Sequence, residues 1–198
     1  MQTSSVSDEV LVEQVGRGDR RAAAELVRRH SPRMLGLAQR MLNDRAEAED
    51  VTQDVFLRVW KMAPNWRPGQ AKFSTWMYRV AVNLCLDRLR KPRMSGLDSA
   101  PEHSDESATP EQSIEAQERA AQVRRALAEL PERQRAAVTL CYFQELSNIE
   151  AAQVLDISIE ALESLLSRGR RGLKAALAAA REDLLEENAR GRSSGFVG

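Results

Sequence analysis

The chain has 198 residues, a formal net charge of zero, 42% hydrophobic residues and only 5% aromatic residues. This length permits one large domain or two small ones, and the scarcity of aromatic residues favours small helical cores over a sheet sandwich. The two cysteines and two histidines form no metal-ligand pattern and no disulfide framework, so we expect no metal, no cofactor and a reducing compartment.

The N-terminal segment is polar and acidic, and no run approaches the roughly 18 apolar residues of a membrane span. We therefore expect a cytoplasmic protein with no membrane partner.

Charge, however, is strongly segregated along the chain. Residues 67–93 carry seven basic residues against one acid, a local charge of +6, and residues 164–181 carry five basic residues and no acid. Residues 98–118 hold seven acids and no basic residue. Such segregation creates local fields that select partners, and it favours two separate nucleic-acid contacts joined by an acidic segment.

The segment from Asp8 to Lys91 reads as helices throughout. Apolar spacing predicts helices over 22–30, 34–42, 45–61 and 73–91. In the third of these, valines recur at positions i, i+4 and i+8 (Val51, Val55 and Val59), while acids and polar residues occupy the opposite arc. From the residues alone, that charged arc is either an ordinary solvated face or a binding surface.

A loop rich in proline and glycine, which contains Trp66, precedes the helix over 73–91. On a helical wheel Arg79, Asn83 and Arg90 fall together on a face away from the apolar stripe, where they can meet phosphates and base edges. Most aromatic residues of the chain lie between positions 60 and 78, close to these cations. Single-stranded nucleic acid needs this combination, because stacking on an exposed ring contributes about 1–3 kcal/mol per base. Core packing is the alternative use of the same rings.

Residues 92–112 contain three prolines and few aliphatic residues, so we expect a linker there. Beyond it, Pro131 opens a helix over 132–143. The sequence from Ser147 to Glu150 forms a capping box that begins a short helix. Asp156 and Ile157 then make a tight turn, and a third helix runs to about residue 180. This arrangement is typical of a helix-turn-helix, with an alternative as a plain helical hairpin.

In the third helix Ile159, Leu162, Leu166 and Leu173 are predicted to be buried. The opposite face carries candidates for major-groove and phosphate contacts. These candidates are Glu160, Ser164, Ser167, Arg168, Arg171 and Lys174.

Several stretches carry a family resemblance. The stretches AEDVTQDVFLRVW (48–60) and FSTWMYRVAVNLCLDRLR (73–90) resemble conserved region 2 of bacterial sigma factors. LPERQRAAV (130–138) and the helix-turn-helix over 146–174 resemble region 4, although Asp156 stands where a turn glycine is common. Together they cover nearly the whole chain, which is similar to the compact extracytoplasmic-function (group IV) sigma factors.

The resemblance implies an all-α fold of two small helical domains joined by a flexible acidic linker. Region 2 would span residues 1–91, the linker 92–113 and region 4 residues 114–185, with a disordered tail over 186–198. It also implies three partners, which are core RNA polymerase, promoter DNA as duplex and melted strand, and an anti-sigma factor.

The resemblance further assigns roles to particular residues. An acidic face would dock on the β′ clamp helices of the polymerase, and it consists of Glu47, Asp50, Gln53 and Asp54. A minus-ten set would capture melted bases, and it consists of Trp66, Arg67, Lys72, Tyr78, Arg79, Asn83, Asp87 and Arg90. Region 4 would bind the β-flap and read the minus-thirty-five element through the six candidates on the third helix, which are called the minus-thirty-five set from here on.

Two other classes of function remain open at this stage. One is a helix-turn-helix regulator that binds DNA without polymerase and uses its N-terminal half to dimerise, and the other is a helical adaptor that binds acidic proteins. An enzyme is disfavoured because the sequence shows no nucleophile with a base, no phosphate-binding glycine loop and no metal cluster.

Overall fold

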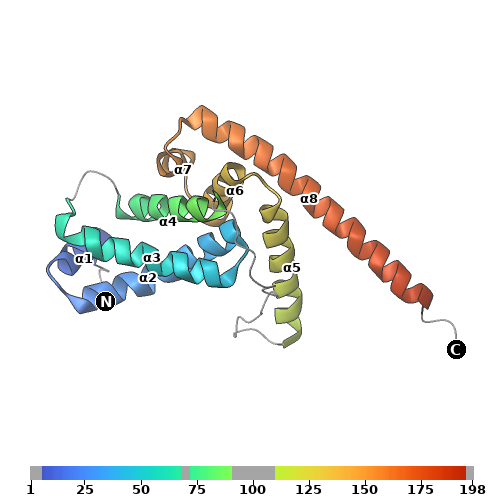
Figure 1. Cartoon of the computed structure of the whole chain (residues 1–198), viewed down its shortest axis with the longest axis horizontal. Coiled ribbons are helices and arrows are strands. Elements are labelled where there is room, and N and C mark those ends of the chain that lie inside the picture. The colour runs from blue at the N-terminus through green and yellow to red at the C-terminus, as the bar shows by residue number, and fades with distance from the viewer. Residues whose placement is uncertain (1–5, 68–71, 91–109, 195–198) are drawn as a thin grey trace, which may run out of the picture.

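The computed structural model describes residues 6–67, 72–90 and 110–194, in which every regular element is helical (Figure 1). An N-terminal unit comprises α1 (Asp8–Gly16), α2 (Arg20–Leu42), α3 (Arg45–Met62), the short 3-10 helix η1 (Ala63–Asn65) and α4 (Phe73–Arg90). A C-terminal unit comprises α5 (Pro110–Ala128), α6 (Glu132–Val138), the π-helix η2 (Thr139–Phe143), α7 (Asn148–Leu155) and α8 (Ile159–Ser194). The all-α prediction is confirmed, while the predicted linker residues 92–109 lie outside the described part of the chain.

The N-terminal unit is built around α2, which contacts α1, α3 and α4. The predicted valine stripe of α3 is confirmed, because Val51, Val55 and Val59 are each at most 1% exposed. From α4, Phe73 and Met77 are fully buried in the same core. Burying one such large side chain contributes about 1.5–3 kcal/mol, so this core fixes the relative positions of α3 and α4.

One long helix, α2, replaces the two helices predicted over 22–30 and 34–42. It continues through Pro32, which has no N–H to donate to the preceding turn. The carbonyl of Arg28, four positions earlier, therefore has no N–H partner at Pro32. Both residues are exposed, so water can bind that carbonyl. On the other side of the helix Leu26, Met34 and Leu37 are buried in one continuous row. Tertiary packing along this row outweighs the local break.

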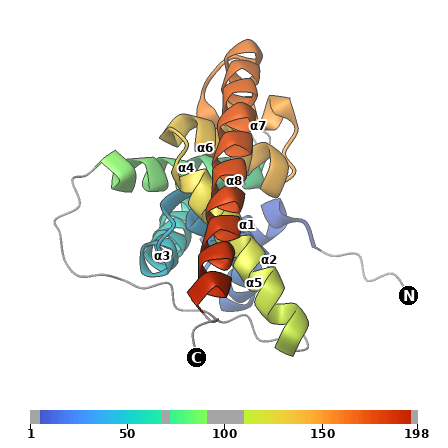
Figure 2. The same ribbon diagram turned by 90° about the vertical axis from the view of Figure 1, so that its right-hand side faces the viewer.

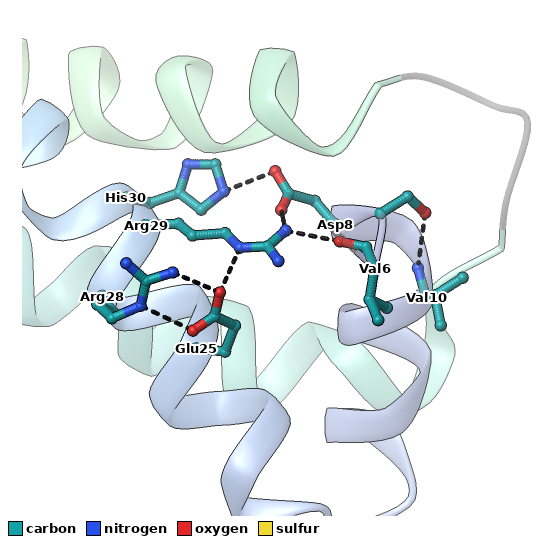
Figure 3. Close-up of polar contacts among 8 residues, drawn as sticks. Val6, Asp8, Val10, Glu25, Arg28, Arg29 and His30 are labelled. Atoms are coloured by element: carbon teal, nitrogen blue, oxygen red, sulfur yellow. Dashed lines mark hydrogen bonds and ion pairs between the residues drawn. The ribbon is translucent and has the colours of Figure 1, made fainter. Parts of the chain in front are cut away.

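A group of ion pairs ties the start of α1 to the middle of α2 (Figure 3). Arg29 Nη1 donates to the Val6 carbonyl at 2.7 Å and to Asp8 Oδ1 at 3.0 Å, and Arg29 Nε donates to Glu25 Oε1 at 2.7 Å. The other oxygen of Asp8 lies 2.7 Å from His30 Nε2. Two neighbouring residues of α2, Arg29 and His30, therefore hold the N-terminus of α1.

The C-terminal unit contains the predicted helix-turn-helix. Ser147 and Glu150 form the predicted capping box, with Glu150 N donating to Ser147 Oγ at 3.3 Å and Ser147 N donating to Glu150 Oε2 at 3.2 Å. Asp156 ends α7 in the left-handed region with φ of 54°, which a short polar side chain tolerates better than most. Ser158 Oγ accepts from Ala161 N at 3.2 Å and so caps α8.

Two features of α8 differ from the sequence-based expectation. Ile159 was predicted to be buried but is 41% exposed, because it begins the helix, one turn before the row that packs on α6. The helix also extends beyond residue 180 to Ser194, through a stretch in which Glu, Arg and Leu, all good helix formers, are the commonest residues. Gly169 allows the close packing on α6, since a Cβ atom there would lie 2.7 Å from Val138 Cγ2.

Within the described ranges no helix combines the length and the apolar character needed to cross a membrane.

The ion pairs of Glu25 predict a pH-dependent contribution to stability. Hydrogen bonds from Arg28 and then Arg29 lower the pKa of the Glu25 carboxyl from its ordinary value of 4.5 to about 2. A lowered pKa in the folded state stabilises the fold above pH 4.5, and this contribution is lost as the pH falls toward about 2. The difference in unfolding free energy between the natural chain and Glu25→Gln should therefore shrink over that interval in urea titrations. A difference that stayed constant with pH would contradict this account.

Candidate nucleic-acid interface

The acidic face lies on α3, on the side opposite the valine stripe. Glu47, Asp50 and Gln53 are exposed and Asp54 is half-buried. The carboxylates are not independent, because Arg88 of α4 reaches across to them. Its Nη1 donates to Glu47 Oε2 at 2.6 Å, its Nη2 donates to Asp54 Oδ2 at 2.9 Å, and Asp50 Oδ2 lies 3.9 Å from Nη1. The face thus presents carboxylates held in a fixed arrangement by a guanidinium beneath them.

Sequence reasoning missed two residues of this face. Arg88 was counted only among the cations of the basic segment, since no local pattern signals a contact between residues 34 to 41 positions apart. Leu57 is 62% exposed and follows Asp54 by three positions, so it lies on the acidic side of α3. An exposed leucine beside charged residues was detectable from the helical wheel. Together these residues make the face a mixed acidic and apolar surface.

Arg88 should stabilise the N-terminal unit measurably. Its side chain is 25% exposed and joins two helices through charge-assisted hydrogen bonds, so we expect Arg88→Gln to lower the unfolding free energy by about 1–3 kcal/mol. Arg88→Lys should recover part of this loss, because an ammonium group can pair with one of the two carboxylates. The measurement is denaturant unfolding, with Arg58→Gln at an exposed position of α3 as the control. Equal losses for Arg88→Gln and Arg58→Gln would contradict the assignment.

The minus-ten set does not form one open surface. Lys72, Arg79 and Asn83 are exposed at the start of α4 and along it, as are Asp87 and Arg90 near its end, where these last two form an ion pair at 2.8 Å. Arg67 is exposed in the loop before α4. The aromatic members behave differently from the cations. Trp66 is half-buried with its ring edge-on to Phe73, and Tyr78 is only 5% exposed.

Three members of the minus-ten set, Lys72, Tyr78 and Arg79, contact the C-terminal unit. Lys72 Nζ pairs with Glu150 Oε1 at 2.9 Å. Arg79 Nη2 donates to the Gln153 carbonyl at 2.5 Å and lies 3.3 Å from Asp156 Oδ1. Tyr78 completes the contact, since its hydroxyl donates to Gln144 Oε1 at 3.1 Å. In the cartoon α7 lies directly over α4, which matches these contacts (Figure 1).

The minus-thirty-five set, by contrast, is entirely exposed along the first half of α8. Its members recur at spacings that place them on one side of the helix, opposite the fully buried Leu162. Glu160 stands in the first turn, where a bond from its own backbone N–H and then one from Ser158 lower the pKa of its carboxyl. Figure 1 shows α8 as one long rod that runs from near α7 past α6 and α5, and in Figure 2 the same helix runs down the view in front of the other helices.

Metal-ligand clusters and a reactive thiol were sought among the described residues. In them, no three His, Cys, Asp or Glu side chains gather as metal ligands. Cys85 is buried, and burial raises the pKa of its thiol to about 12, so it carries no thiolate at neutral pH. The charged sets described above thus lie on two elements of the N-terminal unit, α3 and α4 with the loop before it, and on α8 of the C-terminal unit.

Comparisons with known proteins place each unit in a family. Residues 26–94 match "Sigma-70 region 2" and residues 120–173 match "Sigma-70, region 4". The ECF RNA polymerase sigma factor SigE of Mycolicibacterium smegmatis is 36% identical over 158 residues, which are 78% of this chain and 61% of that protein. The ECF sigma factor SigW of Bacillus subtilis is 30% identical over 82% of this chain and 92% of its own length. RNA polymerase sigma-H factor of Pseudomonas aeruginosa is 34% identical over 86% of this chain and 93% of its own length.

Two solved structures resemble most of the fold. CnrH, solved in complex with the cytosolic domain of CnrY, superposes with a TM-score of 0.67 at 27% identity and covers 87% of this chain and 97% of its own. The sigma factor RpoE of Bartonella quintana, solved with the anti-sigma factor NepR, gives a TM-score of 0.62 over 78% of this chain and 96% of its own. At 20% identity, the second likeness shows a shared fold alone.

Proposed function

Because this chain belongs to the extracytoplasmic-function family of RNA polymerase sigma factors, we propose that it binds core RNA polymerase, directs it to one class of promoters and helps to open the duplex. The observation that carries this proposal is the alignment with SigW and sigma-H over more than nine tenths of their lengths. The protein itself would catalyse no reaction and would act in the cytoplasm, where the polymerase works.

The acidic face of α3 is the proposed polymerase contact. Its carboxylates are exposed yet held in place by Arg88, so a basic partner surface meets charges that are already ordered. Leu57 adds apolar area at the same place. Ordered charge beside an apolar residue is the composition expected of an interface that gives both specificity and affinity. The proposed occupant is the clamp of the β′ subunit.

The two other sets are the proposed promoter contacts. The exposed cations of α4 and the loop before it would bind the melted minus-ten strand. A base of that strand would stack on the exposed part of the half-buried Trp66 ring. The exposed face of α8 would enter the major groove at the minus-thirty-five element, as in other helix-turn-helix proteins. Separate surfaces for duplex and single strand distinguish this function from that of a simple repressor, which needs only the first.

An anti-sigma factor is the third proposed partner. The solved relative RpoE is described in complex with an anti-sigma factor, and CnrH in complex with the cytosolic domain of CnrY. We expect a comparable protein to cover the polymerase-binding surface of this chain.

The overall proposal is tested by run-off transcription with core enzyme at start sites mapped after overexpression. Initiation that depends on this chain supports it, and DNA binding without initiation would favour a regulator that acts without polymerase.

Reversing charge on the acidic face should weaken polymerase binding. The double change Asp50→Lys and Asp54→Lys places like charges against a basic partner, and we expect an affinity about tenfold or more lower with unchanged helical content. Because Asp54→Lys also removes the Arg88–Asp54 pair, affinities are compared under conditions where the helical content of the variant equals that of the natural chain. The matched control is Glu13→Lys with Glu129→Lys, two exposed acids away from this face. Fluorescence titration of core polymerase measures both. Equal affinities for the natural chain and the Asp50/Asp54 variant would remove the clamp assignment.

Removing two arginines from α8 should weaken promoter binding in a salt-dependent way. For Arg168→Ala with Arg171→Ala, each lost phosphate contact lowers the slope of log affinity against log salt by about one. The matched control is Arg17→Ala with Arg20→Ala, two exposed arginines where α1 ends and α2 begins. Holoenzyme binding to a mapped promoter fragment across a salt series gives the slope. A slope that did not change would move duplex recognition elsewhere.

A further inference from the structure

His30 is a buried polar side chain that lies outside the proposed binding surfaces. It stands in the middle of α2 and is only 9% exposed. Its Nε2 atom lies 2.7 Å from Asp8 Oδ2, so one hydrogen bond joins it to the first turn of α1 (Figure 3). A buried polar ring is costly unless it is hydrogen-bonded. Asp8 therefore allows the imidazole to stay in the core.

The same imidazole contacts the start of α4. It meets the ring of Phe73 edge-on, with the ring centroids 5.8 Å apart. Phe73 is the first residue of α4 and is fully buried. It also meets Trp66 edge-on at 5.8 Å and stacks on Trp76 at 6.3 Å. Aromatic pairs at these separations attract one another beyond the effect of burial. His30 thus touches the residue at the centre of an aromatic cluster.

This cluster joins the two ends of the segment that precedes α4. Trp66 stands directly before residues 67–72, and Phe73 stands directly after them. Two cations of the minus-ten set are the immediate neighbours of these rings, because Arg67 follows Trp66 and Lys72 precedes Phe73. The contact between the two rings therefore determines where the chain leaves Trp66 and where it returns with Lys72.

Helix α1 also supports the Trp66 side of the cluster. Its C-terminal end packs on η1, the short helix directly before Trp66. The packing is so close that a Cβ atom on Gly16 would lie 2.6 Å from the Ala63 carbonyl oxygen. That carbonyl accepts a hydrogen bond from Trp66 N at 3.1 Å. One short helix thus bears on Trp66 through one end and on Phe73, by way of His30, through the other.

We propose that Asp8 and His30 are positioning residues for the capture of melted promoter DNA. The carboxylate of Asp8 holds the His30 ring, the His30 ring holds Phe73, and Phe73 holds Trp66. Neither Asp8 nor His30 would touch the strand. The inference rests on the function proposed above and extends the single-strand site to residues of α1 and α2 that lie behind it.

Positioning matters here because the ligand is a flexible strand. Binding it costs conformational freedom on both sides, and a protein surface whose groups are already ordered loses less. A Trp66 ring and two cations held in place would therefore bind the strand more tightly than the same groups on a loose segment. The effect of losing one supporting hydrogen bond should be about three- to tenfold in affinity.

The deciding variant is Asp8→Ala, which removes the hydrogen bond to His30 and one ion pair of Arg29. The matched control is Glu25→Ala. It removes the other carboxylate that is bonded to Arg29, and it leaves the bond between Asp8 and His30 in place. The two variants therefore share the loss of an acid next to Arg29 and differ in the contact of His30.

A second pair of variants isolates the route through His30. In His30→Phe a phenyl ring stays against Phe73 because it is apolar, and it needs no partner at position 8. Asp8→Ala should therefore lower the affinity for the melted strand in the natural background but not in the His30→Phe background. This double-mutant comparison separates the hydrogen bond to His30 from the pair of Asp8 with Arg29.

The main measurement is the affinity of the reconstituted holoenzyme for a single-stranded oligonucleotide that carries the minus-ten sequence of a mapped promoter. Asp8→Ala should lower it about three- to tenfold, whereas Glu25→Ala should leave it unchanged. Affinity for core polymerase and for a minus-thirty-five duplex should stay equal in both, which a general loss of the fold would not allow. In the free chain, amide hydrogen exchange at the start of α4 should accelerate in Asp8→Ala and not in Glu25→Ala.

Four results would overturn the positioning role. Asp8→Ala could match the natural chain in oligonucleotide affinity and in exchange at α4, or Glu25→Ala could show the same loss. The loss in Asp8→Ala could persist in the His30→Phe background, which would assign it to Arg29. Finally, affinity for core polymerase could fall in parallel. Failure of the proposed function is a separate outcome, because the natural chain itself would then give no run-off transcript with core enzyme.

Discussion

The packing of one face of α4 into the N-terminal core is the constraint on which the other surfaces depend. Phe73, Met77 and Cys85 are fully buried, which fixes the rotation of the helix about its own axis. That rotation turns Arg88 toward the acids of α3 and Arg79 toward α7. A single helix therefore orders the carboxylates of the proposed polymerase contact and sets which partners the cations of the proposed minus-ten contact meet. A change in its packing would alter both at once.

Features encoded locally were predictable from the sequence, and features that join distant segments were not. The valine stripe of α3 and the capping box at Ser147 depend on residues within one or two turns, so their patterns are visible in the chain. The pairs of Lys72 with Glu150 and of Tyr78 with Gln144 join residues 78 and 66 positions apart. No periodicity reports such a contact, and each partner alone looks like an ordinary surface residue.

The misjudged local features show the same division. Pro32 is a helix breaker by its own chemistry, yet α2 continues through it because the buried row on the other side spans the break. Ile159 has the spacing of a buried residue, but it is exposed because it begins α8, one turn before the row that packs on α6. Glu145 adopts φ of 57° without glycine or asparagine to announce a left-handed turn. Propensity gives the local preference, and packing decides whether it is obeyed.

The neutrality of the chain has a spatial meaning that the sequence alone conceals. Basic and acidic residues are segregated along the chain, but folding brings many of them together, as in the pairs of Arg88 with Asp54 and of Lys72 with Glu150. In the folded chain Lys72 and Arg79 are paired with acids of α7 and of the turn after it, while Arg168 and Arg171 on α8 stay exposed. A nucleic acid that binds along α8 therefore meets exposed cations, whereas one that binds at α4 competes with Glu150 for Lys72.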